Sequence, residues 1–145
     1  MHKKATLYVI GFVTFSVLQY MWLQVAARDI YKRALEQYVS NEFSLVWFIL
    51  FGVIFSAGLT YIAITREKKR PTMGQSLLRA GVFGGLVFGL INIKNLQFLQ
   101  DWQLGISVID TIWGAVVATA SVALTLIIFE KLEETRNGAK QRPNS

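Results

Sequence analysis

Residues 106–129 read ISVIDTIWGAVVATASVALTLIIF, a run with one ionisable side chain, that of Asp110. A helix needs about 20 apolar residues to cross the hydrocarbon core of a bilayer, and this run has that length. Three similar runs precede it, at residues 5–23, 43–64 and 77–93, and Arg79 is the one charged residue in them. The sequence therefore predicts an all-α protein that forms a bundle of four transmembrane helices.

The composition agrees with an integral membrane protein. The mean hydropathy is +0.41, and 53% of the residues are hydrophobic whereas 17% are charged. A soluble domain of this composition would lack the polar surface to cover itself. We expect one domain over residues 1–130, with transmembrane helices at about 5–27, 43–65, 74–93 and 104–129, and a polar, disordered cytoplasmic tail over residues 131–145.

The positions of the basic residues predict an orientation. Of the 15 Lys and Arg residues, eleven fall on the side of the N-terminus under this topology: Lys3, Lys4, Arg66, Lys68, Lys69, Arg70, Arg79, Lys131, Arg136, Lys140 and Arg142. The other four are Arg28, Lys32, Arg33 and Lys94. This is the positive-inside bias, so both termini are expected in the cytoplasm. The basic run 66–70 could contact anionic lipid headgroups or RNA, but an orienting loop is the favoured interpretation, and no nucleic acid partner is predicted.

The start of the chain could be a signal peptide or a first transmembrane helix. His2, Lys3 and Lys4 before an apolar run resemble a signal peptide, but that run is longer than a signal core, so a retained first transmembrane helix is favoured.

After the first apolar run, apolar residues recur at helical spacing among charged ones: Ile30, Tyr31, Ala34, Leu35, Tyr38 and Val39. This pattern predicts a short interfacial amphipathic helix between the first two transmembrane helices, or an extension of the first of them.

Small residues indicate how the helices pack. Gly81, Gly85 and Gly89 repeat every fourth residue on the third helix, and Gly114 offers a matching face on the fourth. Close backbone approach drives helix association in lipid, which supplies no hydrophobic force between helices. The glycine face is predicted to pack within one chain or to build a homodimer.

Groups that carry chemistry are sparse. The chain has no cysteine, and its one histidine is His2. We therefore predict no catalytic residue, no metal site and no cofactor. Polar and aromatic side chains do gather near the exoplasmic ends of the third and fourth helices, and they are the candidates for ligand or proton binding: Asn92, Lys94, Asn95, Asp101, Trp102, Asp110 and Trp113.

Asp110 is the most informative of these candidates, because an acid within the membrane is costly and needs a partner. Asn92, Lys94 or Arg28 could supply one on the same side. Two interpretations stay open: Asp110 binds a ligand or a proton, or it is a hydrogen-bonding hub that fixes the fourth helix against the third.

The residues also resemble a known family. Asn92-Ile93-Lys94-Asn95-Leu96, then Trp102, then residues 108–114, VIDTIWG, are similar to the signature of the DUF2177 membrane proteins. The resemblance covers nearly the whole chain, and it implies a four-helix protein of the bacterial inner (plasma) membrane without assigning an activity. Relatives often have Tyr-Asp where this chain has Ile91-Asn92, which makes Asp110 the lone acid of the region.

Three classes of function follow from these observations. The first is a noncatalytic membrane protein that binds a small lipophilic ligand or a membrane protein partner through the exoplasmic cluster. The second is a small proton-coupled transporter that uses Asp110. The third is a membrane enzyme, which is disfavoured because the sequence shows no second catalytic group beside an acid.

Overall fold

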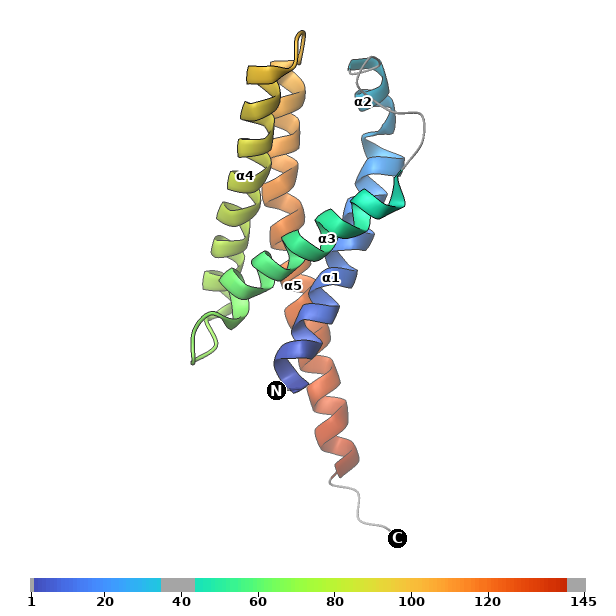
Figure 1. Cartoon of the computed structure of the whole chain (residues 1–145). Coiled ribbons are helices and arrows are strands. Elements are labelled where there is room, and N and C mark those ends of the chain that lie inside the picture. Colours follow the sequence, from blue (N-terminus) through green and yellow to red (C-terminus); the bar gives the residue numbers. More distant parts are fainter. Residues whose placement is uncertain (1, 35–43, 141–145) are drawn as a thin grey trace.

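The computed structural model describes residues 2–34 and 44–140, which are helical apart from short connections (Figure 1). Two helices end in a π-helical turn: α1 (His2–Met21) continues into η1 (Trp22–Ala26), and α3 (Leu45–Thr60) continues into η2 (Tyr61–Thr65). The remaining helices are α2 (Arg28–Ala34), α4 (Met73–Phe98) and α5 (Leu104–Lys140).

Within these described residues, four helical segments are long and apolar enough to cross a membrane: Lys3–Val25, Leu45–Thr65, Met73–Phe98 and Leu104–Gly138. The prediction of an all-α, multi-pass membrane protein with four transmembrane helices is therefore confirmed. The short helix expected between the first two spans is α2, and the rest of the predicted amphipathic segment, residues 35–43, lies outside the described residues.

The long helix α5 organises the bundle, because it packs against α4 on one side and against α1 on the other. Helix α3 runs obliquely across α1, and η2 contacts α4 (Figure 1). The start of α1, the loop of residues 66–72 and the last turns of α5 share one end of the bundle, here called the terminal end. Helix α2 and the α4–α5 turn, residues 99–103, lie at the opposite end, here called the distal end.

Aromatic rings fill the centre of the bundle. The Phe15 and Phe55 rings lie 4.5 Å apart between centroids, and Phe88 meets Phe55 edge to face at 5.6 Å. Beside them, the hydroxyl groups of Thr14 and Thr125 join α1 to α5 by a hydrogen bond of 3.1 Å. Apolar side chains also cover the outer surface, as expected where lipid replaces water.

The beginning of α4 and the end of α5 have local causes. Thr72 and Gln75 form a reciprocal capping box, which satisfies two backbone N–H groups at the start of α4. Helix α5 continues through Lys140, so residues 131–140 of the expected tail are helical, and residues 141–145 lie outside the described part. Helix-forming residues and the ion pair between Lys3 and Glu133 favour this extension.

Candidate functional site

The carboxyl group of Asp110 lies on the second turn of α5 and accepts two short hydrogen bonds at the distal end. The Tyr31 hydroxyl donates to Oδ1 at 2.6 Å, and the Asn92 Nδ2 group donates to Oδ2 at 2.6 Å. Asp110 therefore connects α2, α4 and α5 through two neutral donors.

The orientation of the Asn92 amide follows from its neighbours. Asn92 is 2% exposed, and its Nδ2 group also donates to the Phe88 carbonyl at 3.0 Å. Rotating the amide by half a turn would place its oxygen against two acceptors, so the assignment is determined by chemistry. The Asn92 Oδ1 atom is then a buried acceptor without a hydrogen-bond partner among the described residues.

No basic side chain that the structure describes forms an ion pair with Asp110, and the side chain of Arg33 lies outside the described part. Lys94 and Arg28, the two cations considered as partners for Asp110, are exposed and form no ion pair with the described part of the chain. Of the three partners considered from the sequence, Asn92 alone is bonded to Asp110. Two acceptor groups, one of them a carboxyl, thus lie together without an ion pair to any basic side chain that the structure describes.

Tyr31 remains a donor over the ordinary pH range. Burial of its hydroxyl raises the pKa above the usual value, and the charge of Asp110 and its hydrogen bond raise the pKa further, while the Trp22 side chain acts in the opposite direction. A protonated phenol can donate to the carboxyl group but cannot repel it. The Tyr31 hydroxyl therefore stays neutral, and it donates a hydrogen bond to Asp110 without placing a second negative charge beside it.

Two indole rings stand beside these polar groups. Trp22 on η1 and Trp113 on α5 stack at 4.3 Å between centroids with an angle of 9° between the planes. The Trp113 Nε1 group donates to Gln19 Oε1 at 2.9 Å, which also joins α1 to α5. Because Trp113 follows Asp110 by three residues, both lie on one face of α5. We call Tyr31, Asn92, Asp110, Trp22 and Trp113 the distal cluster.

The other sequence candidates lie in or near the α4–α5 turn and have no hydrogen bond to Asp110. The Asn95 carbonyl accepts the Leu99 N–H at the end of α4. Asp101 is exposed and has a positive φ of 62° in the turn, while the Trp102 Nε1 group donates to Ser107 Oγ at 3.0 Å. These residues shape the turn, whereas Asn92, Asp110 and Trp113 belong to the distal cluster.

The glycines of α4 face α5 within the same chain. A Cβ atom at Gly81, Gly85 or Gly89 would have its nearest neighbour on α5, at 3.0, 3.6 and 3.4 Å. The closest approach is at Gly84, where a Cβ atom would overlap the Gly114 carbonyl and the Ala118 side chain. Gly114 in turn lies against Phe88.

Sequence reasoning missed three members of this arrangement. Tyr31 was recognised as part of an apolar stripe, but the stripe did not indicate that its hydroxyl points to Asp110. Gln19 and Trp22 lie in a run that reads as uninterrupted transmembrane helix.

Within residues 2–34 and 44–140, no group of three or more His, Cys, Asp or Glu side chains could hold a metal ion.

Comparison with known proteins gives one match. The family model DUF2177, described as "Predicted membrane protein (DUF2177)", matches residues 4–127. No curated protein and no solved structure matches the chain.

Proposed function

This chain belongs to the DUF2177 family of predicted membrane proteins, and on that premise we propose that it is a noncatalytic protein that binds a small lipophilic ligand at the distal cluster. The observation that carries the proposal is the Asp110 carboxyl group, which two neutral donors hold and no described cation neutralises. An ionised acid in or near the membrane is unfavourable without a positively charged partner. A ligand can supply the missing positive charge.

The chemistry of the cluster favours a ligand with an amine. Asp110 is partly exposed, so an ammonium group could donate to its carboxyl group. The Trp22 and Trp113 rings add aromatic surface, which attracts cations as well as apolar groups. The apolar part of such a ligand would remain in the lipid beside the bundle.

The orientation belongs to the same proposal. Eleven of the 15 basic residues fall, in the sequence, on the side of the N-terminus, which supports cytoplasmic termini and an exoplasmic distal cluster. The resemblance noted above supports a bacterial inner membrane. The ligand would then reach the distal cluster from the outer half of that membrane.

Binding of 4-phenylbutylamine to the protein in lipid nanodiscs tests the proposal. We expect saturable binding of the amine by isothermal titration calorimetry and none of 4-phenylbutan-1-ol, its neutral counterpart of similar size. Asp110→Asn should abolish binding of the amine. Equal binding of amine and alcohol, or full binding of the amine by Asp110→Asn, would rule out recognition by the carboxyl group.

Proton-coupled transport is the second candidate, because the same Asp110 carboxyl group could exchange a proton for a cationic substrate. Its hydrogen bonds to Tyr31 and Asn92 would hold the carboxyl in place in either protonation state. Proteoliposomes loaded with the amine distinguish the two functions. Transport requires release of the amine that depends on a pH gradient and is lost in Asp110→Asn. A binding protein gives no release above that of amine-loaded liposomes without protein.

A further inference from the structure

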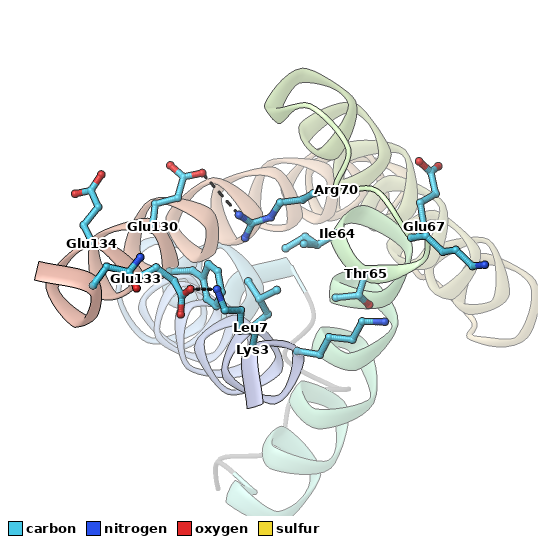
Figure 2. Close-up of a pocket in the computed structure, with 13 residues that line it drawn as sticks. Lys3, Leu7, Ile64, Thr65, Glu67, Arg70, Glu130, Glu133 and Glu134 are labelled. Carbon is cyan, nitrogen blue, oxygen red and sulfur yellow. Dashed lines mark hydrogen bonds and ion pairs between the residues drawn. The ribbon is translucent and has the colours of Figure 1, made fainter. Parts of the chain in front are cut away.

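A second site lies at the terminal end, far from the distal cluster. A cavity of about 580 Å³ opens between the start of α1, the end of η2 with its following loop, and the last turns of α5 (Figure 2). Glu130 lines this cavity on the same helix that carries Asp110, and at 1.5 Å per residue the two lie about 30 Å apart. A ligand of ordinary size cannot contact both sites.

The cavity has an apolar floor and a charged rim. Leu7, Ile64 and Phe129 form the floor, and all three side chains are buried. The Arg70 guanidinium carbon lies 4.8 Å from the centroid of the Phe129 ring. The cavity therefore offers apolar contacts below and charged groups above, which suits an amphiphile.

The ion pairs leave two ammonium groups free at the rim. Four glutamates line the cavity, and three of them pair with basic residues. The ion pairs are Glu133 with Lys3, Glu130 with Arg70 at 4.0 Å, and Glu67 with Arg79 at 2.6 Å. Lys4 and Lys68 line the cavity and form no ion pair with the described part of the chain, and the same is true of Glu134. The unpaired groups at the rim are thus two positive and one negative, so their net charge is positive.

A hydroxyl group adds a further donor. Thr65 Oγ1 and the Tyr8 hydroxyl lie 3.0 Å apart, and either can donate to the other. One of the two hydroxyl hydrogens is not used by this bond. Because Thr65 lines the cavity, this pair can donate one hydrogen bond to an acceptor there.

The depth of the cavity indicates where its ligand comes from. The first span begins at Lys3 and the second ends at Thr65, and both residues line the cavity. The cavity thus opens at the level of the lipid headgroups, where anionic headgroups attract basic side chains. A lipid can enter from the bilayer with its acyl chain toward the apolar floor.

We propose that this cavity binds an anionic phospholipid, whose phosphodiester group contacts Lys4 and Lys68 and whose first acyl carbons lie against Leu7, Ile64 and Phe129. The phosphate oxygens are acceptors that the two ammonium groups and the Thr65–Tyr8 pair can satisfy. This site is independent of the distal cluster and of the function proposed for it.

Native mass spectrometry of the delipidated protein in detergent, titrated with phosphatidylglycerol, tests this proposal. The variant Lys4→Gln/Lys68→Gln should bind phosphatidylglycerol about tenfold more weakly, because it loses two charge-assisted contacts. The matched control is Lys69→Gln/Lys131→Gln, which removes the same charge near the terminal end from two exposed residues outside the cavity lining. The control should bind as the wild type does.

Three results would overturn the proposal. Equal weakening in the two double variants would mean that general electrostatic attraction, not the cavity, binds the lipid. Equal affinity for phosphatidylcholine would exclude selection of an anionic headgroup. Displacement of the lipid by an equimolar amount of glycerol 3-phosphate would show that the cavity recognises free phosphate without an acyl chain. Thermal unfolding in the same detergent verifies that all variants are folded.

Discussion

The Tyr31 hydroxyl donates a hydrogen bond of 2.6 Å to Asp110 Oδ1, across 79 positions of sequence. This bond attaches the short helix α2 to the start of α5, and the stacked rings of Trp22 and Trp113 attach the preceding turn to the same helix. The polar groups of the distal cluster therefore serve two purposes at once. They hold the distal end together, and under the function proposed above they position a carboxyl group for a ligand.

Tyr31→Phe should destabilise the protein by about 1–3 kcal/mol, because a charged acceptor loses a short hydrogen bond at a partly buried site. Thermal unfolding in nanodiscs measures the effect. Tyr61→Phe is the matched control, since Tyr61 is 53% exposed and its hydroxyl forms no hydrogen bond with the described residues. Equal stability of the two variants would mean that the Tyr31 bond contributes nothing net.

Asp110→Asn should leave the stability unchanged or raise it. An asparagine can still accept from Asn92 Nδ2, and its own amide can donate to the Tyr31 oxygen, while the charge is removed from the membrane. Asp110→Leu should instead lower the free energy of unfolding by about 2–5 kcal/mol, because it leaves the Asn92 amide and the Tyr31 hydroxyl without a common acceptor.

The same two variants, compared by thermal unfolding in one nanodisc preparation, separate the roles of Asp110. Strong destabilisation by Asp110→Asn would make the negative charge itself structural and would remove the reason to expect a ligand. Stability of Asp110→Asn together with loss of amine binding would mean that the acid is retained for function.

The sequence was sufficient for the four spans because hydropathy over about 20 residues reflects a strong physical requirement, the burial of every backbone polar group in lipid. It also selected Asp110 and Asn92, since polar residues inside apolar runs are conspicuous. The hydrogen bond between these two residues depends on the way α4 packs against α5. The glycines of α4 favour that helix packing, so the contact of the two residues was reasonable to expect.

The contribution of Tyr31 could not be predicted in the same way. Its place on an apolar stripe is explained equally well by contact with lipid headgroups, and the direction of α2 depends on the π-helical turn η1, which has no clear sequence signal. The cavity at the terminal end was missed for a similar reason. Its residues come from three distant segments whose charges read, one by one, as orienting residues of a loop or tail.

Gly84→Ala should destabilise the bundle strongly, because the new methyl group would overlap the Gly114 carbonyl and force α4 away from α5. Gly85→Ala should have a small effect, since its Cβ would meet the Ala115 Cβ at an ordinary 3.6 Å. Gly74→Ala, with no atom within 4 Å, should stabilise α4 by about 0.5–1 kcal/mol. Thermal unfolding of the three variants gives the order, and a stable Gly84→Ala would contradict the close approach of the two backbones.

The raised pKa of Tyr31 predicts a loss of stability at alkaline pH. In the unfolded chain this phenol has a pKa near 10.0, whereas burial and the charge of Asp110 raise the pKa in the folded protein. A group whose pKa is raised by folding contributes stability that is fully present below the unfolded pKa and is lost as the pH rises toward the folded pKa. The stability difference between the wild type and Tyr31→Phe should therefore be constant from pH 7 to about pH 9 and should shrink above about pH 10. Chemical unfolding in detergent at each pH measures this difference, and subtracting Tyr31→Phe cancels the titration of the other tyrosines and the lysines. A difference that stays constant through about pH 11 would mean that Tyr31 titrates alike in the folded and unfolded states, so neither its burial nor Asp110 would raise its pKa.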